Sequence, residues 1–223
     1  MPLRLHLLRH GQTAASRANV FCGRGLDPDL TPDGLAMADA FARFHHDVLG
    51  VRWTAVYASP LRRTRATAAP AAALANLPVQ PLDGLAELDY GAWDGRTAED
   101  VDRADHDAHV RWTADPAWNA PTGGETAAAL ARRALAALEA ITAAHAGADG
   151  AGGDADVLVV SHKATIRVAL CGLLGVDVGR FRFRFACPTG SVSVVEFGPH
   201  GPMALSVADR AHLDARLRGL PGT

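Results

Sequence analysis

Three adjacent residues stand where a histidine could do chemistry on an anion. The apolar run Leu3 to Leu8 stops abruptly at Arg9-His10-Gly11. A histidine at the carboxyl end of a buried strand, beside an arginine and before a glycine that lets the backbone approach a ligand, is placed to meet a phosphate. A histidine at a strand end is more often a packed or solvated residue, so this interpretation depends on partners elsewhere in the chain.

Removal of a phosphoryl group requires cations around the non-bridging oxygens, a nucleophile in line and a proton for the leaving oxygen. Arg9 and Arg63 could hold the oxygens, and a neutral His10 could attack phosphorus to form a phosphohistidine. Neighbouring guanidinium charge is expected to lower the pKa of His10 and favour the neutral form. His162 could donate a hydrogen bond to the same oxygens. Glu87 is the candidate proton donor, because a carboxyl group beside a bound dianion holds its proton more tightly.

Four apolar segments predict the strands that would position these residues, namely Leu3 to Leu8, Ala55 to Ala58, Val157 to Val160 and Ser191 to Phe197. Helical patterns lie between them. We therefore expect an α/β fold, a three-layer α/β/α sandwich with a mostly parallel central sheet. Ligands bind such sheets beyond the carboxyl ends of the strands. The segments that should meet at this edge are Arg9 to Gly11, Ser59 to Arg65 and Ser161 to Lys163.

Capping residues and apolar spacing predict the helices. Thr31-Pro32 supplies a hydroxyl N-cap and an initial proline, and the apolar face that follows consists of Leu35, Ala38, Ala42 and Leu49. Ser59-Pro60 repeats the pattern before a helix through Ala75. Two further helices are expected around Leu130 to Ile141 and from about Thr165 to Leu174. The glycine-rich segment 147–153 precedes a strand, so it is interpreted as a flexible connector.

The composition limits the possible partners. With 223 residues and 48% hydrophobic residues the chain can bury a full core, and we expect a single domain, 1–223. A formal net charge of -2 argues against general binding to nucleic acid or anionic membranes. Three cysteines without paired spacing favour a reducing cytoplasm, and no segment approaches membrane-spanning length.

Five motifs occur in the order typical of a known family: LRHGQT at 8–13, SPLRRTRATA at 59–68, LAELDYGAWDG at 85–95, GGET at 123–126 and VSHKATIRVAL at 160–170. The chain resembles the histidine phosphatase superfamily, in its phosphoglycerate-mutase-like branch, from residue 3 to about residue 197. The resemblance implies that His10 is the phosphorylated nucleophile and Glu87 the acid and base. It places Arg9, Arg63 and His162 in the phosphate pocket, with Arg63 chosen over Arg62 because it stands four residues after the motif serine.

The resemblance also implies substrate contacts and a lid. The candidate substrate-binding residues are Gly11, Gln12, Thr13, Ser16, Arg24, Tyr90 and Lys163. Ser16 stands where family members often carry asparagine, and Lys163 where a glycine or small residue is common. Lys163 could add positive charge to the mouth of the site or point into solvent. An insert at about 88–125 is expected to form the lid, and Trp112 and Trp118 in it could line a pocket or only pack.

Asp105, His106, Asp107 and His109 have the composition of metal ligands. They fall in a polar segment where a solvated helix face is the commoner explanation, and no third ligand of a His106 and His109 pair is specified. We therefore expect no metal and no cofactor.

The preferred function is a phosphomonoesterase that acts on a small phosphorylated metabolite. A phosphoglycerate-type mutase is the alternative, because it would use the same phosphohistidine with a different acceptor. In the family that the chain resembles, mutases usually carry a longer insert between the glutamate and the second histidine, so the resemblance together with the short interval from Glu87 to His162 favours the hydrolase. A non-catalytic scaffold is a third hypothesis, and it predicts loss of His10, Arg63, Glu87 or His162, all of which are present. The substrate and the oligomeric state stay open.

Overall fold

A mostly parallel sheet forms the centre of the computed structural model, which describes residues 3–145 and 155–222. The strand order is β3-β2-β4-β1-β5-β6. The strands are β1 (Leu3–Arg9), β2 (Trp53–Ala58), β3 (Val79–Pro81), β4 (Ala155–Ser161), β5 (Val192–Gly198) and β6 (Gly201–Asp209). The neighbouring pairs β1 and β4, β2 and β4, and β2 and β3 are parallel. β5 is antiparallel to both of its neighbours, β1 and β6. The predicted α/β class and the four predicted strands are confirmed. β3 and β6 were not predicted, because β3 is only three residues long and β6 has no buried residue.

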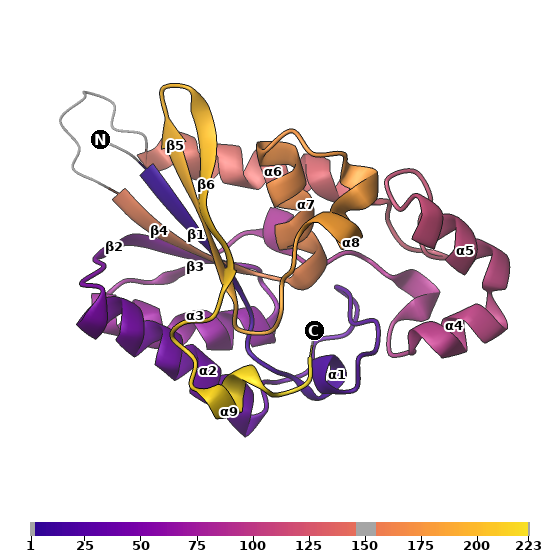
Figure 1. The fold of residues 1–223 in the computed structure, drawn as a ribbon, viewed down its shortest axis with the longest axis horizontal. Coiled ribbons are helices and arrows are strands. Elements are labelled where there is room, and N and C mark those ends of the chain that lie inside the picture. Colours follow the sequence, from indigo (N-terminus) through magenta and orange to yellow (C-terminus); the bar gives the residue numbers. More distant parts are fainter. Residues whose placement is uncertain (1–2, 146–154, 223) are drawn as a thin grey trace.

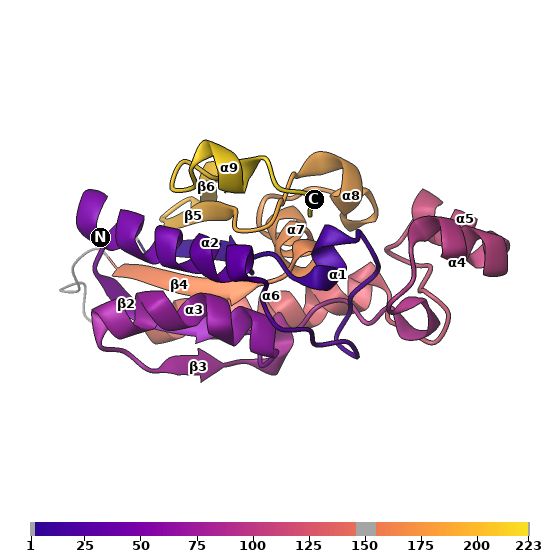
Figure 2. The same cartoon turned by 90° about the horizontal axis from the view of Figure 1, so that it is seen from below.

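Helices cover both faces of the sheet (Figures 1 and 2). The buried side chains of β1 and β4 alternate between the two faces, as period-two strands require. Leu7 and Val159 pack with α6 (Ala127–His145) and α7 (Lys163–Leu173). Leu8 and Val160 pack with α2 (Pro32–Arg43) and α3 (Arg62–Ala75). Burial on both sides explains why these strands are continuous apolar runs, and the expected three-layer arrangement is confirmed.

Helix α2 buries Ala38 and Ala42 of the predicted apolar face, but not the other two predicted residues. Its buried apolar residues are Met37, Ala38, Phe41 and Ala42. Leu35 is 53% exposed and Leu49 is 55% exposed, so their assignment to the core face was wrong. At 3.6 residues per turn, Leu35 lies about a quarter of a turn from the centre of the buried face. Leu49 follows a π-helical turn, Phe44–Val48, which breaks the α-helical spacing.

The N-terminus of α3 also differs from the prediction. The helix starts at Arg62, and its N-cap is Leu61, which makes no side-chain capping bond. The prediction that Ser59 caps this helix was therefore wrong. The Ser59 hydroxyl instead lies 2.8 Å from His162 Nε2. Helix α7 begins at Lys163, two residues before the predicted start.

The segment around 88–125 stands at one end of the molecule, where Figure 1 places α4 (Ala98–Ala104) and α5 (His106–Ala114). Trp93 and Trp112 are buried in an apolar cluster that joins this segment to α6, α7 and Phe181. Trp118 is 77% exposed. The other short helices are α1 (Ala14–Arg17), α8 (Phe181–Arg184), α9 (Ala215–Arg218) and the 3-10 turns Asp83–Leu85, Gly91–Trp93 and Val178–Arg180.

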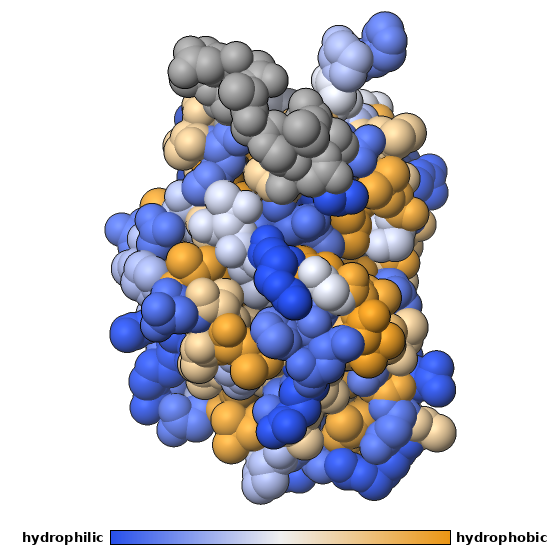
Figure 3. All heavy atoms as spheres, turned by 90° about the vertical axis from the view of Figure 1, so that its left-hand side faces the viewer, coloured by the Kyte–Doolittle hydropathy of each residue, from blue (hydrophilic) through white to orange (hydrophobic). Residues whose placement is uncertain are grey.

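The opposite end of the molecule is a mixed surface. Figure 3 shows hydrophilic side chains spread over this face between smaller hydrophobic groups. The glycine-rich segment 147–153, predicted as a connector, lies outside the described residues. Within 3–145 and 155–222, no helix has the length and apolar character needed to cross a membrane. Cys22, Cys171 and Cys187 are all free thiols.

Candidate active site

The two motif histidines meet at the carboxyl edge of the sheet. β1 and β4 are parallel neighbours, and Arg9 is level with Ser161 in their register. Each histidine therefore follows its strand at the same level. The ring centroids of His10 and His162 are 5.3 Å apart, although 151 residues separate them in the chain. The expected convergence of strand ends is thus present in the structure.

His10 is held in one tautomer. Its Nδ1 lies 2.8 Å from the carbonyl oxygen of Gly11. Because a carbonyl oxygen only accepts, Nδ1 must carry the proton, and Nε2 keeps its lone pair. Burial lowers the pKa of His10 well below its usual value, and the nearby charges of Arg63 and Arg9 lower it further. The ring is therefore neutral and nucleophilic at Nε2. Guanidinium charge was predicted to lower the pKa of His10, and the structure shows that burial is the larger cause.

His162 is fully buried and is oriented by a serine. Its Nε2 lies 2.8 Å from the Ser59 hydroxyl oxygen, which connects the end of β4 to the end of β2. Its Nδ1 is buried and has no hydrogen-bond partner among the described residues. Burial, followed by the charge of Arg63, lowers the pKa of His162 well below its usual value. An unpaired buried ring nitrogen is costly, so this atom is suited to a ligand.

Backbone carbonyls position the two motif arginines. Arg9 Nη1 donates to the carbonyl oxygens of Cys187, at 2.6 Å, and Gly222, at 3.1 Å. Arg63 donates through Nη1 to the Leu26 carbonyl oxygen at 2.8 Å and through Nη2 to that of Gly23 at 3.0 Å. The Nε atoms of both arginines are buried without a partner in the described part of the chain. The site therefore holds two oriented guanidinium groups with unused donors.

The choice between neighbouring arginines agrees with the structure. Arg63 is buried, whereas Arg62 and Arg65 are exposed. Arg62 pairs with Asp29 on the surface. Arg63 is thus the arginine of this motif whose charge reaches the two histidines.

Glu87 is fixed against the first turn of α7. Its carboxylate oxygens accept hydrogen bonds from the backbone amides of Leu88 at 2.8 Å, Ala164 at 3.2 Å and Thr165 at 3.2 Å. The Thr165 hydroxyl donates a further bond at 3.1 Å. These contacts hold a buried carboxyl group at the wall of the pocket that His10 also lines.

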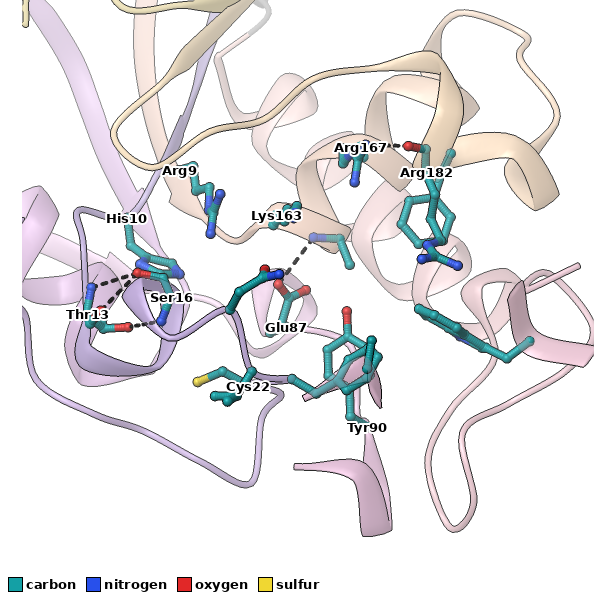
Figure 4. Close-up of a pocket in the computed structure, with 17 residues that line it drawn as sticks. Arg9, His10, Thr13, Ser16, Cys22, Glu87, Tyr90, Lys163, Arg167 and Arg182 are labelled. Atoms are coloured by element: carbon teal, nitrogen blue, oxygen red, sulfur yellow. Dashed lines mark hydrogen bonds between the residues drawn. The ribbon is translucent and has the colours of Figure 1, made fainter. Parts of the chain in front are cut away.

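A pocket of about 280 Å³ opens over His10 and Glu87 (Figure 4). Its lining comes from the end of β1, from α1 and the loop after it, from the loop at Glu87, from the insert, and from α7 and α8. The lining residues are Arg9, His10, Thr13, Ser16, Asn19, Val20, Phe21, Cys22, Glu87, Tyr90, Ala98, Trp112, Lys163, Ala164, Arg167, Phe181 and Arg182. Arg63 and His162 are buried and are not part of this lining.

Four of the predicted substrate contacts line the pocket: Thr13, Ser16, Tyr90 and Lys163. Ser16 is engaged locally, since its hydroxyl accepts from the Thr13 amide at 2.9 Å. Lys163 faces the pocket, which favours the first of the two predicted alternatives. Burial and the charges of Arg9 and Arg167 lower the pKa of Lys163 to about 8.

Three predicted contacts do not line the pocket. The Arg24 side chain is exposed elsewhere. Gln12 is buried, and its Nε2 donates to the Pro221 carbonyl oxygen at 2.8 Å. Gly11 is a glycine because of close packing, since a Cβ there would lie 2.3 Å from the carbonyl oxygen of Gly34. This contact is a reason for glycine at position 11, and an approach of the Gly11 backbone to a ligand stays a prediction.

The acidic and histidine-rich stretch of the insert is satisfied by local pairs. Asp102 accepts from His106 at 3.0 Å and from His109 at 2.9 Å, and Asp105 accepts from the Trp93 indole at 3.1 Å. In the described ranges, no three His, Cys, Asp or Glu side chains gather in a way that could hold a metal ion.

Two arginines of the pocket were missed by sequence reasoning. Arg167 lies four residues after Lys163 on α7, a spacing that places both on one helix face. Arg182 comes from the short helix α8 and had no motif to indicate it. The spacing of Lys163 and Arg167 was the available signal.

The comparison with known families agrees with this geometry. The profile of the histidine phosphatase superfamily, branch 1, matches residues 5–210. The chain belongs to the histidine phosphatase superfamily. Its similarity to other members covers nearly the whole chain, so the pocket lies within the shared region.

Among these histidine phosphatases, the chain is 32% identical to phosphoserine phosphatase 1 of Hydrogenobacter thermophilus, over 95% of this chain and 94% of that protein. It is 34% identical to the glucosyl-3-phosphoglycerate phosphatase of Mycolicibacterium vanbaalenii, over 78% of this chain and 76% of that protein. A solved mycobacterial glucosyl-3-phosphoglycerate phosphatase with inorganic phosphate superposes with a TM-score of 0.79 at 28% identity, covering 95% and 99% of the two chains.

Proposed function

We propose that this protein is a phosphomonoesterase that hydrolyses small phosphorylated metabolites through a phosphohistidine at His10. The observation that carries the proposal is the buried His10 ring, which keeps its Nε2 lone pair in a site where nitrogen atoms of Arg9, Arg63 and His162 are buried and have no partner among the described residues. Donors withdrawn from water and left without acceptors suit the non-bridging oxygens of a phosphoryl group.

In the first step, His10 Nε2 attacks phosphorus, and the bond between phosphorus and the ester oxygen breaks. Arg9, Arg63 and His162 stabilise the charge on the three remaining oxygens. Glu87 transfers its proton to the leaving oxygen, so the alcohol departs neutral.

In the second step, water attacks the phosphohistidine and Glu87 accepts a proton from it. The bond between phosphorus and Nε2 breaks, inorganic phosphate leaves and the neutral imidazole is restored. Both steps use only side chains of this chain, the ester and water. Relatives named as phosphatases support water as the final acceptor over the second substrate hydroxyl that a mutase would use.

We infer that the segment at about 88–125 of this single domain acts as the lid. Tyr90, Ala98 and Trp112 from this segment line the pocket, which supports a role in choosing the alcohol part of the substrate. We also infer a cytoplasmic location, which the three free cysteines support.

Trapping of the phosphoenzyme tests the function. Protein that is mixed with a ³²P-labelled phosphomonoester and quenched in alkaline detergent should carry one phosphoryl group. This group should be stable in alkali and lost in acid, because a phosphorus–nitrogen bond hydrolyses in acid. His10→Ala should lose the label, and its turnover should fall at least about a thousandfold. His106→Ala, on an exposed histidine, is the matched control and should retain both.

Turnover that survives in His10→Ala would refute the mechanism. Phosphate release should also proceed without a bisphosphorylated primer. Isomerisation of the ester that depends on such a primer would identify a mutase instead.

A further inference from the structure

The proposed steps leave three basic side chains of the pocket without a role: Lys163, Arg167 and Arg182. In Figure 4, Arg167 and Arg182 lie at the end of the pocket away from His10, and Lys163 lies between. This end therefore faces the alcohol part of a substrate whose phosphoryl group lies at His10.

The placement of these cations is unfavourable in the free protein. Lys163 and Arg167 are four residues apart in the first two turns of α7, so they repel each other on one helix face. Positive charge near a helix N-terminus is also disfavoured by the helix dipole. Arg167 is nevertheless held firmly, because its Nε donates to the Phe185 carbonyl oxygen at 2.6 Å and its Nη2 to that of Arg182 at 2.5 Å. Basic side chains that are held close together in spite of this electrostatic repulsion indicate a binding site for an anionic ligand.

Arg182 supplies an unused donor. Its guanidinium carbon lies 4.2 Å from the ring centroid of Trp112, which fixes the plane of the group. Its Nη1 is buried and has no hydrogen-bond partner in the described part of the chain. Throughout the described residues, no carboxylate forms an ion pair with Arg167 or Arg182. A desolvated guanidinium donor on the pocket wall is a ready ligand for an oxygen anion.

The charge balance of the lining leads to the same conclusion. Arg9, Lys163, Arg167 and Arg182 face a single lining carboxylate, Glu87, among the residues that the structure describes. A phosphate dianion at His10 would offset only part of this excess of positive charge, and Arg63 behind the lining adds to the excess. A second anionic group on the substrate would balance more of it.

We propose that Arg167 and Arg182, assisted by Lys163, form a second anion subsite that binds a carboxylate or a second phosphate on the alcohol part of the substrate. The inference rests on the proposed phosphomonoesterase function and narrows its substrate class. The preferred substrates are compact phosphomonoesters with a second anion, and the aromatic wall of Tyr90 and Trp112 limits their size.

Matched ligand pairs test the subsite without turnover. Calorimetry on the His10→Ala protein compares phosphoserine with phosphoethanolamine and 3-phosphoglycerate with glycerol 3-phosphate, which differ by the carboxylate. Fructose 1,6-bisphosphate against fructose 6-phosphate tests a second phosphate. A charge-assisted contact predicts about 10- to 100-fold tighter binding of the doubly anionic member of at least one pair.

Variants in the same background assign that preference to residues. Arg182→Gln should reduce the ratio of the two dissociation constants to within about threefold of one, and Lys163→Met should reduce it in part. Arg184→Gln removes the same charge from the exposed side of α8 and should leave the ratio unchanged. Arg167→Lys is a second test that keeps the charge but loses the oriented fork, so it should weaken the preference while the helix remains folded.

The outcomes separate the two proposals. Equal binding within every pair, or a ratio that Arg182→Gln does not change, would overturn the second subsite. Failure of the His10-intact protein to hydrolyse any of these esters would refute the phosphomonoesterase function, while the binding ratios would still report the subsite.

Discussion

At the scale of single residues, the environment of the two histidines determines the chemistry. The carbonyl oxygen of Gly11 selects the tautomer of His10, and the Ser59 hydroxyl orients His162. Burial beside arginine charge disfavours the imidazolium form of both rings. A neutral ring can attack phosphorus, whereas an imidazolium has no lone pair to offer.

We predict that both rings stay neutral between about pH 8 and pH 6, because their pKa values lie well below the usual value of about 6.5. Two-dimensional NMR of ¹⁵N-histidine protein measures this directly. The signals that disappear in His10→Ala and His162→Ala identify the two rings. Free histidine added to the same sample is the control and should titrate with a midpoint near pH 6.5. A titration midpoint near this value for either ring of the protein would contradict the prediction.

At the scale of elements, a close backbone contact holds the nucleophile turn against α2. A Cβ on Gly34 would lie 2.1 Å from the Gln12 carbonyl oxygen, and one on Gly11 would lie 2.3 Å from that of Gly34. Thr31 caps the same end of α2 by accepting from the Gly34 amide at 3.0 Å. The turn after β1 can occupy its position only because both residues lack a side chain.

We predict that Gly34→Ala lowers the free energy of unfolding by about 1–3 kcal/mol or more, because the backbone on both sides must move apart. Urea denaturation measures the change. Gly198→Ala is the matched control, because a Cβ there meets nothing within 4 Å. Activity of Gly34→Ala should fall as well, since the turn carries His10. Equal stability of the two variants would show that the contact is not constraining.

At the scale of the whole molecule, a second group of histidines lies in the core away from the pocket. His45 and His212 pack with Phe41, and burial lowers the pKa of each to about 4. In the unfolded chain these rings titrate near pH 6.5. Between these values the unfolded state binds more protons, so stability is present above about pH 6.5 and is lost as pH falls towards 4.

We predict that His45→Phe reduces this acid sensitivity. A shift from about 6.5 to about 4 corresponds to about 3 kcal/mol for one ring. The loss of unfolding free energy between pH 7 and about pH 4 should therefore be smaller in the variant by up to about 3 kcal/mol. Urea titrations at both pH values measure it. The same loss in the variant and the parent would exclude His45 as a source of acid instability.

The sequence alone was enough to identify the fold class and the catalytic candidates. His10 and His162 directly follow apolar runs, and parallel strands bring their carboxyl ends together, so local order in the chain predicted proximity in space. Strands buried on both faces are recognisable as continuous apolar segments. The short strand β3 and the exposed strand β6 lack this signal, and they were missed.

Only the tertiary structure decided the contacts that depend on distant segments. Ser59 orients His162 instead of capping a helix, the backbone at Gly11 packs closely against Gly34, and Arg182 on α8 becomes part of the pocket wall. Spacing along the chain carries information about neighbours in one helix or strand. Contacts between elements depend on how the elements pack, which no local pattern encodes. The sequence by itself therefore determined where the phosphoryl chemistry could occur, and the packing of α7, α8 and the insert decided what surrounds the rest of the substrate.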